Sequence, residues 1–166
     1  ATWYPPADAR HRVVSTMQNL KELRYDQSPS GPFVWLMDSL MGAVEVCVHK
    51  DPSLTEIERA VGLQITAVRD TQEALKMLKQ RRITKREKVA IPLLKAYLGM
   101  IKGNTLSRTW EKGLAKQHKV QHKMDKLGKD TTRFLQALNL VSHPKTPITA
   151  IARTVGKFKN NVEDLH

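Results

Sequence analysis

The sequence predicts an all-α protein, a compact multi-helix domain of eight or nine helices. Apolar residues recur at helical spacing along almost the whole chain, and no stretch alternates as a half-buried strand does. Capping patterns, Pro and Gly divide the chain into segments of helical length. The 166 residues, 40% of them hydrophobic, suit a single domain over 1–166. Two small helical lobes, about 1–82 and 83–166, are the alternative.

The first two predicted helices flank a turn of sequence Pro29-Ser30-Gly31-Pro32. One helix begins after Asp8 and ends before this turn. The next covers about 33–48 and is apolar on nearly all sides. Because it is shorter than the ~20 residues that cross a bilayer, we expect it to be a buried core helix. The single cysteine, Cys47, lies in it and is expected to be a small buried hydrophobe.

Two capping boxes predict where later helices begin. Ser53 and Glu56 have the required spacing, and so do Thr84 and Glu87. We expect breaks at Gly62, at Pro92, at Gly103-Asn104, at Gly128 and at His143-Pro144, because Gly and Pro interrupt helical patterns. The predicted helices after residue 50 therefore cover about 51–62, 65–82, a short segment from 84, 91–102, 106–127, 134–141 and 147–162.

Positive charge is concentrated in the middle of the chain. The net charge is +12, and the segment 79–129 alone holds 15 Lys and Arg residues against three acidic residues, so the flanking segments are neutral in sum. An ordinary solvated surface mixes both signs. The concentration predicts an anionic partner, which is either nucleic acid or the anionic face of a membrane.

Two clusters in this segment are the candidate polyanion-binding residues. At a helix junction they are Arg81, Arg82, Lys85, Arg86 and Lys88. On the long basic helix they are Lys112, Lys116, Lys119, Lys123 and Lys126, which recur every three or four residues and so share one face. We expect the two clusters to form one cationic belt across neighbouring helices. Aromatic residues make up only 5% of the chain, so we expect phosphate contact without base stacking.

His118 and His122 are four residues apart on the same predicted helix. This spacing is compatible with metal binding, but Lys119 and Lys123 would repel a cation, so no metal site is expected. A response to pH is the favoured interpretation, because histidine gains charge as the pH falls below ~6.5. Acid would then change the charge of an already cationic face. Two exposed histidines without a role are the alternative.

Catalysis has little support in the sequence. The chain has no Gly-rich phosphate loop and no recognisable local grouping of Ser, His and an acid. Acidic residues such as Asp8, Asp38, Glu45 and Asp51 are scattered at positions suited to caps and ion pairs. We therefore expect no enzyme activity, no cofactor and no small-molecule substrate.

The order of several segments resembles the N-terminal domain of the orthomyxovirus matrix protein, the influenza type in particular. The similar segments are the Pro29-Ser30-Gly31-Pro32 turn, 50–61, the apolar helix 94–104 that ends near an Asn, the basic stretch 113–124 (GLAKQHKVQHKM) and 147–160. This chain differs in having spaced Lys and His where the family has a compact Arg/Lys run, which puts nuclear import through that element in doubt. Residues 63–88 have no counterpart.

The resemblance implies a structural function. Such proteins are all-helical, form a layer under the viral envelope, bind anionic lipid and ribonucleoprotein, and self-associate. It implies a location in the virion at the inner face of the envelope, and in the host cell in the cytoplasm, at membranes and, if import occurs, in the nucleus. It also implies that the five lysines of the long basic helix contact the polyanion. The alternatives are a cellular helical RNA- or DNA-binding protein of ribosomal or nucleoid type, and a basic module that binds an acidic partner protein.

Overall fold

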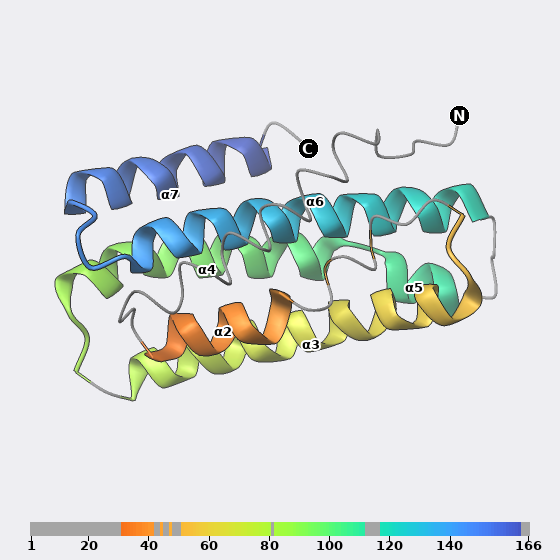
Figure 1. The fold of residues 1–166 in the computed structure, drawn as a ribbon, viewed down its shortest axis with the longest axis horizontal. Helices are drawn as coiled ribbons and strands as arrows, with labels where there is room; N and C mark the ends of the chain where they lie inside the picture. The colour runs from red at the N-terminus through yellow and green to blue at the C-terminus, as the bar shows by residue number, and fades with distance from the viewer. Residues whose placement is uncertain are drawn as a thin grey trace.

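Long helices pack side by side along one axis of the molecule (Figure 1). A computed structural model describes residues 31–41, 44, 47, 51–80, 82–111 and 117–163. In chain order its helices are α2 (Gly31–Met41), α3 (Leu54–Lys79), α4 (Lys85–Gly103), α5 (Leu106–Glu111), α6 (Gln117–Ser142) and α7 (Ile148–Glu163). None of the described residues is in a strand, so the all-α prediction is confirmed.

Both predicted capping boxes are formed. The Ser53 hydroxyl accepts from the Glu56 amide at 3.2 Å, and the Glu56 carboxylate accepts from the Ser53 amide at 3.0 Å. At the start of α4, Thr84 and Glu87 make the same reciprocal pair at 3.2 and 3.0 Å. Each box satisfies two backbone N–H groups that the first helical turn leaves without a partner.

Three predicted breaks are wrong, because α3 continues through Gly62, α4 through Pro92 and α6 through Gly128. Gly costs only about 1 kcal/mol and Pro about 3 kcal/mol in a helix interior relative to Ala. Each position has a buried apolar neighbour in the chain (Leu63, Leu93 and Leu127), and this burial offsets the cost. In α4, for example, Ala90 and Leu93 flank the proline and are both buried.

The break in α6 was predicted at Gly128, where polar residues also follow the apolar pattern. The buried stripe in fact runs on through Thr131 to Phe134 and Leu138. The Thr131 hydroxyl lies 2.9 Å from the Tyr97 hydroxyl on α4, so this polar residue occupies a core position with its hydrogen bond made.

The predicted count of eight or nine helices is not confirmed. Within the described residues there are five helices of eleven residues or more and the six-residue α5. The three continuous helices account for part of the difference. The helix predicted after Asp8 lies outside the described residues.

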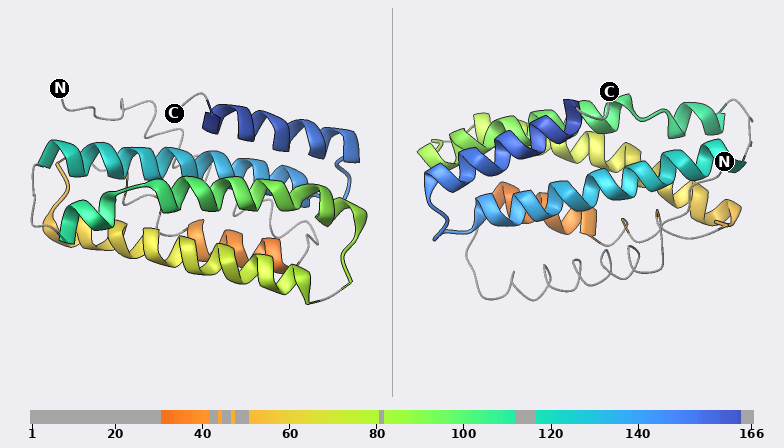
Figure 2. Two further views of the ribbon diagram at one scale, coloured as in Figure 1. Left: turned by 180° about the vertical axis from the view of Figure 1, so that it is seen from behind. Right: turned by 90° about the horizontal axis from the view of Figure 1, so that it is seen from above.

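The α6 helix is the centre of the bundle and packs against α2, α3, α4, α5 and α7. Its Phe134 stacks on Tyr97 of α4 with ring centroids 3.9 Å apart, and lies 6.1 Å from the ring of Phe158 on α7. The α3 helix packs against α2 and α4 (Figure 2). These contacts join α2 and α3 to the later helices in one described core.

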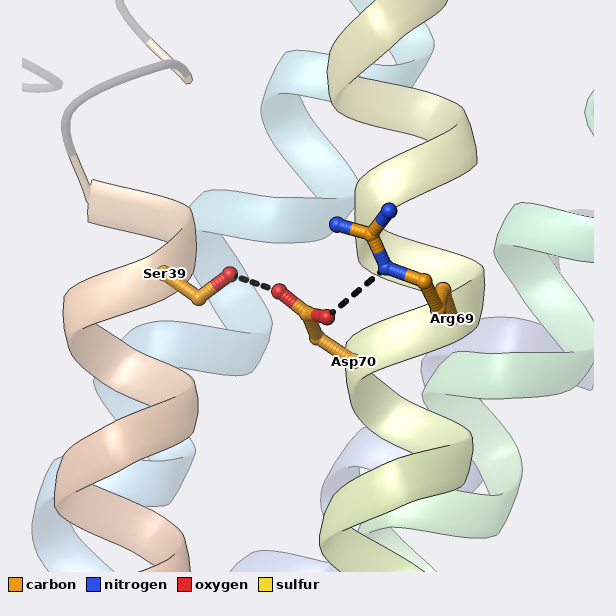
Figure 3. Close-up of polar contacts among 3 residues, drawn as sticks. All are labelled: Ser39, Arg69 and Asp70. Atoms are coloured by element: carbon orange, nitrogen blue, oxygen red, sulfur yellow. Dashed lines mark hydrogen bonds and ion pairs between the residues drawn. The ribbon is translucent and has the colours of Figure 1, made fainter.

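A polar contact joins α2 to α3 (Figure 3). The Ser39 hydroxyl of α2 donates to one carboxylate oxygen of Asp70 on α3, and Arg69 Nε donates to the other at 3.2 Å. Asp70 is buried, whereas Arg69 is 70% exposed. The carboxylate is therefore used in holding the two helices together.

A second polar network fixes the turn between α4 and α5. Gln64 of α3 donates to the carbonyl oxygens of Ile101, at 3.0 Å, and Asn104, and accepts from Ser107. Asn104 in turn donates to the carbonyl oxygen of Lys123 on α6 at 3.1 Å. The end of α4 is thereby held against both α3 and α6.

Candidate polyanion-binding surface

In the later helices, negative charges are buried and most positive charges are exposed. Between residues 82 and 161, the acidic side chains that the structure describes are Glu87, Asp125 and Asp130, and all three are buried. The exposed acidic side chains among the described residues are Asp38, Asp51, Glu58 and Glu73, all earlier in the chain. The exposed cations of the later part are Arg82, Lys85, Lys88, Lys95, Lys102, Arg108, Lys119, Lys129, Arg133, Lys145, Arg153, Lys157 and Lys159. The described surface of α4, α6 and α7 is therefore cationic and carries no exposed carboxylate.

The junction cluster lies at the start of α4. Arg82, Lys85 and Lys88 are exposed. Arg86 is half-buried, and its guanidinium donates to the carbonyl oxygen of His143 at 2.6 Å, which ties α4 to the turn between α6 and α7. Arg86 thus stabilises the contact between α4 and this turn. The predicted Arg81 lies outside the described residues.

The second cluster is described only in part. Lys119 is exposed at the start of α6, and Lys123 and Lys126 are half-buried, with stems along the bundle. Lys112 and Lys116 lie outside the described residues. His122 is exposed on the same helix, whereas the side chain of His118 lies outside the described part.

The described members of the two clusters lie apart along α6. Because Arg81, Lys112 and Lys116 lie outside the described residues, one continuous belt stays a prediction. The α4 helix begins where α6 ends (Figure 1), as the bond from Arg86 to His143 requires. Lys126 precedes His143 by 17 residues on α6 and its following turn, which is about 25 Å at the helical rise. An unbroken α6 of 26 residues lies between these two positions.

One row of cations on α4 and the continuation of the predicted row on α6 were missed. On α4, Lys88, Lys95 and Lys102 are exposed and seven residues apart. On α6, the row from Lys119 through Lys126 continues to Arg133 at the same spacing. The seven-residue spacing is visible in the sequence, but the predicted breaks at residues 92 and 128 cut both rows.

The α4 row and the α6 row face different sides of the molecule. The two helices pack against each other, and each row lies on the exposed side of its own helix. The α6 helix lies in front of α4 in Figure 1, and α4 lies in front in the view from behind in Figure 2. The protein therefore presents two separate cationic faces.

The interior beneath the α6 row holds Asp125, which is 1% exposed. Burial raises the pKa of its carboxyl to about 7, while the hydrogen bond from Gln121, at 2.8 Å, and the charge of Lys129 oppose the rise. Burial, with a smaller effect of Asp125, raises the pKa of the Cys47 thiol to about 12. Cys47 is fully buried, so its prediction as a small hydrophobe is confirmed, and the thiol stays protonated.

The part of the chain that the structure describes has neither a metal cluster nor a membrane-spanning helix. No group of three or more His, Cys, Asp and Glu side chains there is placed to hold a metal ion. None of the described helices combines the length and apolarity needed to cross a bilayer.

No family model, no curated protein and no solved structure matches this chain. The resemblance to the orthomyxovirus matrix family therefore stays a prediction from the sequence.

Proposed function

We propose that this protein is a non-catalytic structural protein that binds anionic surfaces through charge, in the manner of a matrix protein. Its partners are anionic membrane and RNA or ribonucleoprotein, and it self-associates into a layer. Membrane and ribonucleoprotein binding, self-association and a location at the inner face of a viral envelope rest on the resemblance of the sequence to the matrix family.

The observation that carries the proposal is the difference in exposure between the acidic and the basic side chains of α4, α6 and α7. The described acids of these helices are buried, and the cations are exposed. A helix loses a few tenths of a kcal/mol for each pair of like charges at neighbouring surface positions. Contact with a polyanion offsets that repulsion and releases the counterions that condense on the partner.

The composition of these faces favours contact without sequence recognition. Most of their charges are lysines, whose ammonium groups are compact point charges on flexible stems. Arginines, whose planar guanidinium groups can form paired hydrogen bonds with the edge of a base, are few. The aromatic rings described in α4 and α7 are buried, so they offer no stacking platform. Affinity should therefore depend on the charge density of the partner far more than on its sequence.

Flotation with vesicles and electrophoretic mobility shift with RNA test this proposal together. The protein is expected to float with vesicles that contain phosphatidylserine, to stay behind with vesicles of neutral phosphatidylcholine, and to shift single-stranded RNA of unrelated sequences equally. Binding to RNA with no flotation would instead favour a cellular nucleic-acid-binding protein. Binding to neither, with tight binding to one acidic protein, would contradict the proposal.

A further inference from the structure

The lysine row on α4 was not predicted as one group from the sequence. Lys88, Lys95 and Lys102 are exposed, and the helical rise places successive members about 10 Å apart, so the row is about 20 Å long. Pro92 and Gly99 lie between them and carry no charge. The whole exposed side of α4 thus presents positive charge.

Apolar side chains border this row where α4 meets α3. Val68 and Leu75 of α3 and Ile91 and Leu98 of α4 are partly buried against the core, and α3 packs against α4. Ile65 of α3 is 56% exposed. An exposed apolar residue therefore lies beside the last lysine of the row.

Ile65 and Lys102 meet in an open depression of about 290 Å³ at the end of the row. Ile65, Val68 and Ile101 supply its apolar wall, and Lys102 supplies the charge. Gln64 and Ser107 also line it, but the Ser107 hydroxyl donates to the Gln64 side chain at 2.6 Å, so these polar groups already have partners. The depression therefore offers one cation and an apolar surface.

The exposed acidic residues of α3, Glu58 and Glu73, do not line this depression. Glu58 precedes Ile65 by seven residues, so it lies on the same side of α3, about 10 Å toward the start of that helix and beyond the end of α4. Glu73 is eight residues after Ile65, which turns it by about 80° around the helix axis. The positions that follow Ile65 at seven-residue spacing are Gln72 and Lys79, both exposed.

We propose that this face, formed by Lys88, Lys95, Lys102 and Ile65, lies against the surface of an anionic bilayer. Phosphate and carboxylate headgroups complement the three lysines, and the exposed isoleucine enters the boundary between headgroups and acyl chains. RNA complements the lysines but has no apolar layer for Ile65, so the exposed isoleucine favours lipid. The inference rests on the proposed function and assigns one of its partners to one face.

The first test compares two sets of variants that lose the same charge. K88Q/K95Q/K102Q removes the α4 row, and K119Q/K126Q/R133Q removes the row of identical spacing on α6. Each cation near an anionic bilayer contributes about fivefold, so the α4 set should weaken binding to phosphatidylserine vesicles on the order of 100-fold. The α6 set should weaken it by less than tenfold. Circular dichroism checks that both sets stay helical.

The second test separates lipid from RNA by an uncharged change. Ile65→Ser should weaken vesicle binding by about tenfold, because roughly half of an isoleucine side chain would no longer be transferred from water into the bilayer. The matched control is Leu140→Ser, a change at another exposed apolar residue, 45% exposed on α6, which should leave vesicle binding as it is. Binding of both variants to single-stranded RNA should equal that of the unmodified protein.

Two outcomes overturn the inference while the proposed function stands. In one, the α4 and α6 sets weaken vesicle binding equally. In the other, Ile65→Ser binds vesicles as the unmodified protein does, or loses RNA binding to the same extent as vesicle binding. If the unmodified protein itself binds neither anionic vesicles nor RNA, the proposed function fails as well.

Discussion

Asp125 is an acid inside the most basic helix of the protein. It lies on α6 with 1% of its surface exposed, beside Gln121 and within electrostatic reach of Cys47 and Lys129. One of its carboxylate oxygens has no hydrogen-bond partner. Burial removes the carboxylate from water, and its hydrogen bonds in the protein do not fully replace that solvation. The charged form is therefore disfavoured, and the pKa of the carboxyl is raised to about 7.

The raised pKa gives stability a definite pH dependence. The folded protein holds this proton up to about pH 7, whereas an unfolded aspartate loses it near its ordinary value of 3.8. The stabilisation is therefore complete below the unfolded pKa and is lost as the pH rises toward 7. Between about pH 5 and about pH 8, the free energy of unfolding should fall by roughly 3 kcal/mol through this group.

Asp125→Asn isolates this effect, because an amide of the same shape does not titrate. Urea unfolding at several pH values should show the decline for the unmodified protein and a flatter profile for the variant. The difference between the two profiles removes the contribution of the histidines. Parallel profiles would mean that the carboxyl is ionised in the folded protein throughout this range.

The sequence does not reveal this burial. Asp125 belongs to a stripe with Gln121, Gly128 and Thr132, all buried and none strongly apolar. Periodicity finds a helix face only when its residues are apolar. Because α6 packs against five other helices, two of its sides are buried, and the polar side resembles a solvated one in the sequence.

At the scale of elements, helix starts were predicted well and helix interiors poorly. Ser53 and Thr84 begin α3 and α4 as expected, because a capping box is a local structure whose partners are three residues apart. Whether a helix continues through Gly or Pro depends on neighbours that are distant in the sequence. Those neighbours are on α2, α4 and α6, which the local pattern does not contain.

Gly62→Ala tests the continuity of α3. Gly62 is exposed, and a Cβ at this position would meet nothing within 4 Å. Inside a helix, alanine should raise the free energy of unfolding by about 1 kcal/mol, measured by urea or thermal unfolding. Gly99→Ala on α4 is the matched control, with the same exposure and the same open space. A loss of stability in Gly62→Ala alone would indicate that α3 is interrupted there.

At the scale of the whole molecule, net charge was a better guide than the positions of individual cations. The segment 79–129 carries a charge equal to that of the entire chain, and this is plain from the sequence. The arrangement of that charge is a property of packing. Arg86 is engaged with the turn after α6, the junction cluster and the Lys119 region lie at different ends, and the α4 row faces away from the α6 row.

The separation of the faces follows from the central position of α6. Each helix that packs on α6 turns its own polar side outward, so cations on different helices diverge. The sequence contains both rows, at spacings of seven residues, but only the packing shows that they point apart. Two surfaces of one protein are thereby able to meet two anionic partners.

The salt dependence of binding tests the central claim most directly. If the cationic faces act by counterion exchange, the logarithm of affinity for single-stranded RNA and for phosphatidylserine vesicles should fall linearly with the logarithm of salt concentration. For five or six charges neutralised on RNA, affinity for RNA should drop by on the order of 100-fold or more between about 50 mM and about 200 mM salt. An affinity that is the same at both salt concentrations would contradict the account.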